Sequence, residues 1–190
     1  ADGDTLDEKV SRQSEQAIFE ADVVLFVVDT TVGVTEDDAR VATLLRGTDT
    51  TVILIANKVD DRVHESSIWE LMSLGLGEPM PVSALHGRGA GDMLDRIVAA
   101  LPDVVDEVPD EVETDGGDPR VVGVALVGRP NVGKSTLFNR LTGEERAVVH
   151  DRPGTTRDTI DTIVETPHGP VRFIDTAGMR RKARIDEETE

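Results

Sequence analysis

Residues 128–135 of this 190-residue sequence read GRPNVGKS, and their types and spacing suit a loop that binds phosphate groups. The pattern Gly-x-x-x-x-Gly-Lys-Ser follows an apolar stretch and precedes a segment with helical periodicity, which is the context that such a loop requires. Gly128 and Gly133 allow the backbone to bend around an anion. The amide groups from Val132 to Thr136, at the start of the helix, are then expected to point at the β-phosphate.

Other residues in and after this loop predict a divalent cation beside the phosphates. Lys134 is expected to place a positive charge at the β- and γ-phosphates, and Ser135 to offer its hydroxyl to Mg²⁺. Farther along, FIDTAG places Asp175 at the carboxyl end of an expected strand, where a carboxylate suits Mg²⁺ through a water molecule. The amide of Gly178 in the same motif is predicted to meet the γ-phosphate.

Between these two motifs lies a Gly-Thr-Thr loop, within the sequence DRPGTTRD at residues 151–158. One of its threonines is expected to complete the set of metal ligands when a γ-phosphate is present, and we favour Thr156 over Thr155. The residues predicted to act on a transferring phosphate are therefore Lys134, Thr156 and Gly178.

The tetrapeptide NKVD, residues 57–60, precedes the phosphate loop in the chain and predicts recognition of guanine. The Asp60 carboxylate can accept hydrogen bonds from guanine N1–H and N2–H₂ together. Adenine lacks this pair of donors, so a site of this kind can reject it by roughly 10⁴-fold. Lys58 is expected to lay its alkyl stem along the base, and Asn57 to connect this loop to the phosphate loop.

A third short motif, SAL at residues 83–85, follows the next expected strand and precedes a glycine-rich turn. Ser83 and Ala84 are expected to lie beside the base, with the Ala84 amide donating to guanine O6. Because the carboxyl ends of parallel strands meet at one edge of a sheet, the base loops and the phosphate loop should converge there.

Composition limits the class of protein. The net charge of −18 is divided unevenly, with −11 in residues 1–101, −7 in residues 102–120 and 0 in residues 121–190, so no overall field attracts DNA or RNA. There is no cysteine, which excludes disulfides and thiolate metal sites. There is also no run of about 18 apolar residues that could span a membrane. We therefore expect a soluble, cytoplasmic protein without membrane or DNA partners.

The elements that must position these motifs alternate between strands and helices, which predicts an α/β sheet. Residues 1–101 contain expected strands at 22–29, 51–56 and 79–83, and expected helices at 6–20, 36–46, 64–74 and around an apolar stripe from Met93 to Leu101. Residues 121–190 contain an expected strand at 121–128, a helix at 134–141 and two strands within 158–175. Residues 102–120 combine prolines, glycines and acids without periodicity, which predicts a linker.

Neither segment is complete alone. The stretches 22–29 and 121–128 are continuously apolar, as in parallel strands that are covered on both faces and paired on both edges. Residues 121–190 offer too few elements to cover such a strand, so they need a partner.

Together, these motifs resemble the Der/EngA family of tandem-domain ribosome-assembly GTPases, in the TrmE-Era-EngA group of the TRAFAC class. Residues 1–101 are similar to the back half of the family's first GTPase domain, 102–120 to its acidic linker and 121–190 to the front half of its second domain. The resemblance implies a P-loop GTPase fold, a three-layer α/β/α arrangement with a mostly parallel six-stranded sheet.

The resemblance also implies a function: GTP binding and hydrolysis coupled to a conformational switch, with GTP or GDP and Mg²⁺ bound. In the full-length family this activity serves assembly of the large ribosomal subunit, so that subunit or its rRNA is the implied partner. Where related GTPases carry a water-orienting glutamine, this chain has Met179. Relatives with a hydrophobic residue there use K⁺, and the resemblance implies that Asn131 helps to hold it.

The family's strand order, 2-3-1-4-5-6, makes the stretches 22–29 and 121–128 neighbours in one sheet. We therefore predict a single circularly permuted GTPase domain, or the same pairing exchanged between two chains. Two alternatives remain open at this stage: a nucleotide-binding fragment without useful turnover, and a naturally permuted GTPase of the YjeQ or YlqF kind.

Overall fold

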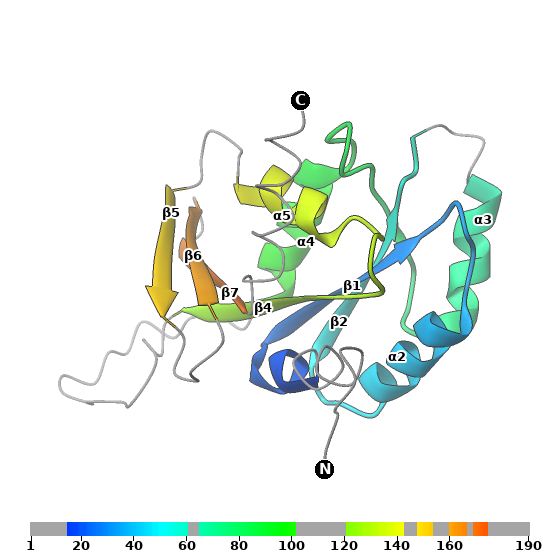
Figure 1. The fold of residues 1–190 in the computed structure, drawn as a ribbon, viewed down its shortest axis with the longest axis horizontal. Helices are drawn as coiled ribbons and strands as arrows, with labels where there is room; N and C mark the ends of the chain where they lie inside the picture. The colour runs from blue at the N-terminus through cyan, green and yellow to red at the C-terminus, as the bar shows by residue number, and fades with distance from the viewer. Residues whose placement is uncertain are drawn as a thin grey trace, which may run out of the picture.

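The structure, a computed structural model, describes residues 15–60, 65–101, 121–142, 148–153, 160–166 and 169–174. These residues form one seven-stranded sheet with helices on both faces (Figure 1). Across the sheet the strands are β3 (Met80–Pro81), β2 (Thr51–Asn57), β1 (Val23–Asp29), β4 (Val122–Val127), β7 (Gly169–Ile174), β6 (Ile160–Thr166) and β5 (Val148–Pro153).

The sheet is parallel from β3 to β7, and β6 and β5 continue it with antiparallel pairings. Its centre is the parallel pairing of β1 with β4, which runs from Val23 opposite Val124 to Phe26 opposite Val127. Elements on opposite sides of the 102–120 segment thus share one sheet. The predicted P-loop GTPase fold in circularly permuted order is confirmed.

The pairing of β1 with β4 begins with two hydrogen bonds just before β1. The Asp22 amide donates to the Gly123 carbonyl oxygen at 2.8 Å, and the Gly123 amide donates to Asp22 Oδ2 at 2.7 Å. These bonds fix the register of the two strands, so that their side chains alternate between the two faces in step.

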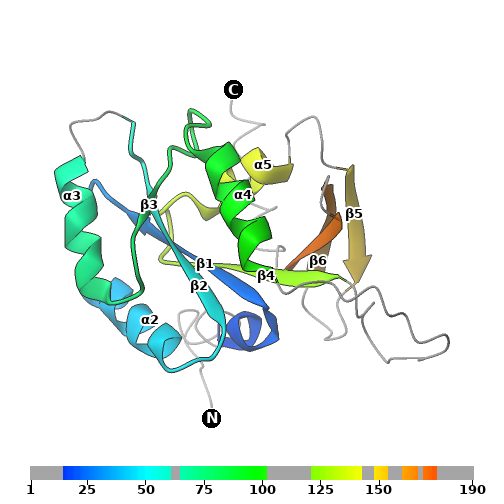
Figure 2. The same cartoon turned by 180° about the vertical axis from the view of Figure 1, so that it is seen from behind.

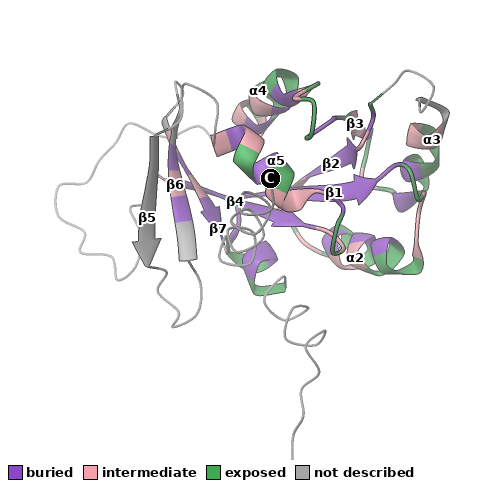
Figure 3. Ribbon diagram, turned by 45° about the horizontal axis from the view of Figure 1, so that its top comes forward, coloured by how far each residue is buried: buried purple, intermediate pink, exposed green. Residues whose placement is uncertain are grey.

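Two apolar cores cover the two faces of the sheet. On one face, Val23, Leu25 and Val27 of β1 pack in a cluster with residues of α4 (Ala90–Ala100) and α5 (Lys134–Thr142). On the other, Val24, Phe26 and Val28 pack with α2 (Glu36–Arg46) and the 3₁₀ helix η2 (Leu71–Leu74), which continues α3 (Glu65–Glu70). Every β1 residue is buried, as expected for a central strand. Figure 2 shows α4 and α5 from behind, and Figure 3 shows the buried strands between the helical layers.

Three local features differ from the sequence expectations. The sheet has one strand more than the predicted six, because residues 148–153 add an antiparallel edge to β6. The tolerance of edge strands for proline is consistent with Pro153 at the end of β5. The expected helix at 64–74 changes to a 3₁₀ helix after Glu70 and ends at Gly75, whose φ is +67°. The third difference is the length of the short strand at 79–83, which is only Met80–Pro81.

Two expected segments lie wholly or partly outside the described residues. The linker at 102–120 is one of them, and nothing in the structure describes it. Of the expected helix at 6–20, residues 15–20 are described and are helical. None of the helices in the described ranges is long and apolar enough to cross a membrane.

Val124→Ala tests whether the two segments unfold as one unit. Val124 lies in β4 and is fully buried, so the substitution should lower the free energy of unfolding by about 1–3 kcal/mol. The probe is the fluorescence of Trp69 in α3, the single tryptophan, which lies in the other segment. Urea unfolding followed by Trp69 should shift together with far-UV circular dichroism.

The matched control is Val32→Ala, because Val32 is 60% exposed and its truncation should change stability by less than about 0.5 kcal/mol. An unchanged Trp69 transition in Val124→Ala would contradict a shared cooperative unit.

Candidate nucleotide-binding site

The loops that carry the predicted site residues meet at one edge of the sheet. β1, β2 and β4 are parallel neighbours, so their carboxyl ends lie together and are followed by the loops at 30–35, 58–60 and 128–133. The segment after β3 joins them through a hydrogen bond from the Val59 amide to the Val82 carbonyl oxygen at 3.1 Å. This is the crevice in which open α/β sheets bind ligands.

Asn57 connects three of these loops. Its side chain is buried, and Nδ2 donates to the Val132 carbonyl oxygen in the phosphate loop at 2.7 Å. Oδ1 accepts from the Ala84 amide at 3.0 Å. One buried side-chain amide therefore fixes the positions of the NKVD loop, the SAL segment and the phosphate loop relative to one another. Both its donor and its acceptor are satisfied.

Two glycines allow this close approach. A Cβ placed on Gly133 would lie 2.2 Å from Asn57 Nδ2, and the Gly133 φ is +99°. A Cβ on Gly128 would lie 2.3 Å from the carbonyl oxygen of Val27, which lies within β1. The phosphate loop is thus pressed against residues of the other segment at both of its glycines, where a larger residue would force backbone shifts.

Lys134, the first residue of α5, folds back over the phosphate loop. Its Nζ donates to the carbonyl oxygens of Gly128 and Arg129, each at 2.6 Å. The ammonium group therefore lies beside the phosphate loop. Ser135 is half-buried next to it, whereas Thr136 is exposed, as is Asn131, whose φ is +65°.

An ion pair between the half-buried Arg129 and the buried Asp38 connects the phosphate loop to α2. Arg129 Nε donates to Asp38 Oδ1 at 3.0 Å, and the Asp38 side chain is fully buried. The other carboxylate oxygen, Oδ2, accepts from the amide and hydroxyl of Thr35 at 3.1 and 2.7 Å. Sequence reasoning missed this pair, because in the sequence Asp38 is only the third acid of a helix start.

Asp60, the predicted guanine reader, is held by its neighbours and remains accessible. Ser83 Oγ donates to Asp60 Oδ1 at 2.6 Å, and His86 Nε2 lies 4.0 Å from the same oxygen. The Asp60 side chain is 45% exposed. The carboxylate is therefore oriented by the fully buried Ser83 and is open to a ligand.

Lys58 also has a buried partner that the sequence did not predict. Its Nζ donates to Asp29 Oδ2 at 2.7 Å, and Asp29 Oδ1 accepts from the amide and hydroxyl of Thr31. Burial alone would raise the pKa of Asp29, but the hydrogen bonds from Lys58 and Thr31 outweigh it and keep the pKa below its usual value. Asp29 is thus a carboxylate at neutral pH and holds the lysine in place.

The Ala84 amide differs from its expected state. It was predicted to donate to guanine O6, but in this structure it donates to Asn57 Oδ1. An incoming base would have to share this donor or displace the Asn57 oxygen from it.

Several predicted site residues lie outside the described residues, so the structure does not place them: Thr155, Thr156, Asp175, Gly178 and Met179. Within the described ranges, no group of three histidines, cysteines or acids is arranged to hold a metal ion. Of the magnesium ligands predicted from the sequence, Ser135 is the one that lies within the described residues.

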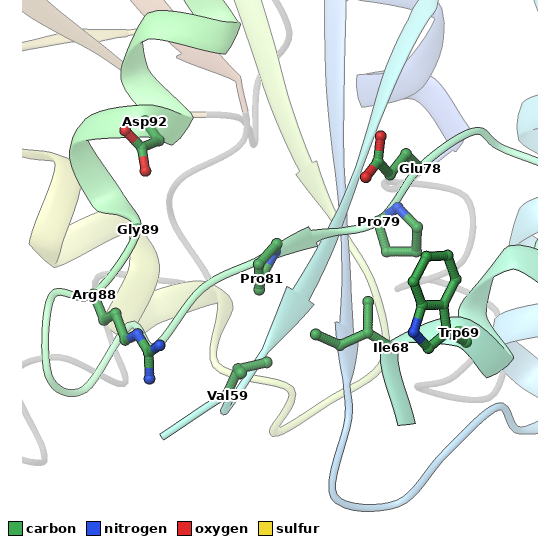
Figure 4. Close-up of a pocket in the computed structure, with 9 residues that line it drawn as sticks. All are labelled: Val59, Ile68, Trp69, Glu78, Pro79, Pro81, Arg88, Gly89 and Asp92. Atoms are coloured by element: carbon green, nitrogen blue, oxygen red, sulfur yellow. The ribbon is translucent and has the colours of Figure 1, made fainter. Parts of the chain in front are cut away.

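A separate cavity of about 410 Å³ lies at the β3 edge of the sheet (Figure 4). Apolar and charged side chains both line it; the residues are Val59, Ile68, Trp69, Glu78, Pro79, Pro81, Arg88, Gly89 and Asp92. None of the residues predicted for the nucleotide site lines it.

Comparison with known proteins agrees with this geometry. The family model described as "50S ribosome-binding GTPase" matches residues 123–190. GTPase Der of Symbiobacterium thermophilum is 52% identical over 189 residues, which cover 100% of this chain and 39% of that protein. GTPase Der of Leifsonia xyli subsp. xyli is 54% identical over 182 residues, which cover 96% of this chain and 37% of that protein.

The chain is a relative of GTPase Der. The resemblance to the Der/EngA family inferred from the motifs is thereby confirmed, and the chain spans about two fifths of the length of these relatives. Among solved structures, YjeQ from Thermotoga maritima matches with a TM-score of 0.51 at 18% identity, covering 84% of this chain and 49% of that one. YjeQ thus shares the fold, whereas the sequence is similar to that of GTPase Der.

Gly133→Ala tests the contact between the phosphate loop and Asn57. The added methyl group would overlap Asn57 Nδ2 and would strain a positive φ, so we expect a loss of about 1–3 kcal/mol in stability. We also expect at least about tenfold weaker binding of a fluorescent GDP analogue, because both loops must shift. Thermal unfolding and fluorescence titration measure the two effects.

Gly91→Ala is the control, since nothing lies within 4 Å of a Cβ at that position in α4 and alanine favours a helix. It should not destabilise the protein. Equal behaviour of the two variants would argue against a tight contact at Gly133.

Proposed function

We propose that this chain binds GTP or GDP at the crevice where the NKVD loop meets the phosphate loop, and that it hydrolyses GTP. The observation that carries the proposal is the hydrogen bond from Asn57 to the Val132 carbonyl oxygen. It joins the NKVD segment to the phosphate loop, more than 70 residues away in the chain, and this contact supports a single shared site. The similarity to proteins named GTPase Der supports the same conclusion.

In this proposal the base is read at one end of the crevice. Asp60, oriented by Ser83, accepts from guanine N1–H and N2–H₂, and Lys58 covers the base with its stem. The Ala84 amide donates to O6 when the base shares the contact with Asn57. Because these groups complement guanine, they would leave Asp60 unpaired with adenine and so reject it.

The phosphates lie at the other end, over the start of α5. The amides from Val132 to Thr136 and the Lys134 ammonium group stabilise the negative charge of the phosphates. The N-terminus of a helix also favours negative charge. The hydroxyl of Ser135, the carboxylate of Asp175 and the hydroxyl of Thr156 or Thr155 are oxygen ligands of the kind that Mg²⁺ requires. Mg²⁺, when bound, neutralises phosphate charge, and Gly178 orients the γ-phosphate.

We also propose that K⁺ binds at this site and that Asn131 helps to hold it. This residue is exposed in the phosphate loop, and Met179 provides no group that could orient water as glutamine does. K⁺, when bound, supplies positive charge near the β- and γ-phosphates. Met179 also favours the second candidate function, that of a nucleotide-binding fragment which binds GTP and GDP without useful turnover.

We further propose that the chain combines parts of two GTPase domains of a longer protein: 1–101 from the first, 102–120 as linker and 121–190 from the second. The match of the GTPase family model from Gly123 onward supports this division. The description of that model as a 50S ribosome-binding GTPase supports the large ribosomal subunit as a partner of the full-length protein. Cosedimentation of a full-length relative with 50S subunits, in GTP and in GDP, tests that role, and no association in either state would exclude it.

Titration with a fluorescent GDP analogue tests the shared site. Asp60→Ala should weaken binding by about 100-fold or more because it removes the acceptor for two guanine donors. Lys134→Ala, in the other segment, should have an effect of similar size because the phosphates lose their cation. Asp37→Ala, a surface acid of α2, controls for the change in net charge and should bind normally. Retained affinity in either site variant would refute a common pocket.

Single-turnover hydrolysis at saturating GTP distinguishes an enzyme from a nucleotide-binding fragment without useful turnover. We expect GTP cleavage to be at least about tenfold faster in K⁺ than in Na⁺, with the difference reduced in Asn131→Ala. Release of phosphate is the measured quantity. Rates that do not depend on the monovalent cation would contradict the role of Asn131. No cleavage in K⁺ would leave only nucleotide binding without turnover.

A further inference from the structure

Helix α5, which begins at the phosphate loop, also contacts the SAL segment at residues 83–85. Its first residue is Lys134, and Arg140 lies six residues farther along the same helix. Arg140 Nη2 donates to the Leu85 carbonyl oxygen at 2.7 Å, and Arg140 Nε donates to the Ala84 carbonyl oxygen at 3.3 Å. The guanidinium group therefore binds two successive peptide groups of the SAL segment.

The Arg140 guanidinium group also packs closely against the turn that follows the SAL segment. A Cβ on Gly87 would lie 3.3 Å from Cζ and Nε of Arg140, so the guanidinium group packs against the turn that follows the SAL segment. Gly87 has a φ of +71°, which lets the turn form at this point. A planar group with donors in a fixed fork suits two neighbouring carbonyls better than the single ammonium group of lysine would.

Fixing these two carbonyls also fixes the amides that follow them. In a planar trans peptide the carbonyl and the next N–H point in opposite directions, so Arg140 sets the directions of the Leu85 and His86 amides. The rest of the segment is held from its other side: the Ala84 amide donates to Asn57, and Ser83 Oγ accepts from the His86 amide at 3.2 Å while it donates to Asp60. Arg140 and Asn57 thus hold the loop between them.

We propose that Arg140 is a positioning residue for guanine recognition, which makes the orientation of the base-reading loop depend on the phosphate-binding helix. The inference rests on the proposed nucleotide site and adds to it a residue from outside the three motifs. Arg140 touches neither base nor phosphate in this scheme; it acts through Ala84 and Leu85.

The test compares a ligand that has a base with one that has none. In the full chain, GDP and inorganic tripolyphosphate are each used to displace a fluorescent GDP analogue. Arg140→Met should weaken GDP binding by about tenfold or more, because hydrogen bonds from a charged donor are lost. Tripolyphosphate affinity should stay within about twofold of wild type, since the phosphate loop is untouched. Arg140→Lys, which keeps the charge, should give an intermediate GDP affinity.

Arg40→Met is the matched control, because Arg40 is 75% exposed on α2 and pairs only with nearby acids in the described residues, Glu36 and Asp37. GDP affinity within about twofold of wild type in both Arg140 variants would overturn the proposal. Equal weakening of GDP and tripolyphosphate would also overturn it, because the role would then be general stability. Wild-type protein that binds no GDP would overturn the proposed function itself, which is a different outcome. Arg140→Lys keeps the test decisive if Arg140→Met does not fold.

Discussion

The parallel pairing of β1 with β4 is the interaction on which the rest of the structure depends. Both strands are buried along their whole length, so neither can remain at the edge of a sheet without exposing an apolar surface. Pairing them completes both cores, and it also places the carboxyl ends of β1, β2 and β4 side by side. The site therefore exists only because the two segments share a sheet.

The sequence determines much of this arrangement, because its main signals are local. Continuous apolar stretches marked β1 and β4, and the glycines and Lys134 marked the phosphate loop. Other features depend on distant partners. The ion pair of Arg129 with Asp38 joins residues 91 positions apart, and the contact of Arg140 with Ala84 spans 56. Residues of these types are common on surfaces, so nothing in the linear sequence distinguishes them.

The extra strand β5 and the divided helix at 65–74 have a similar explanation. Residues 148–153, VVHDRP, mix β-branched and polar types, and only the ladder with β6 makes them a strand. In the site, Asn57 was anticipated as a connecting residue, but the occupation of the Ala84 amide by its side chain depends on geometry. Which acceptor a given amide binds is determined by tertiary packing and cannot be predicted from a sequence motif.

The buried side chain of Asn57 also determines how the two ends of the crevice respond to sequence change. Since a single amide touches both loops, a shift of one loop alters the environment of the other. Substitutions near Asp60 and near Gly133 should then be epistatic, with combined effects that depart from additivity by about 0.5–3 kcal/mol. In such a fold, base preference and phosphate affinity are therefore expected to evolve together.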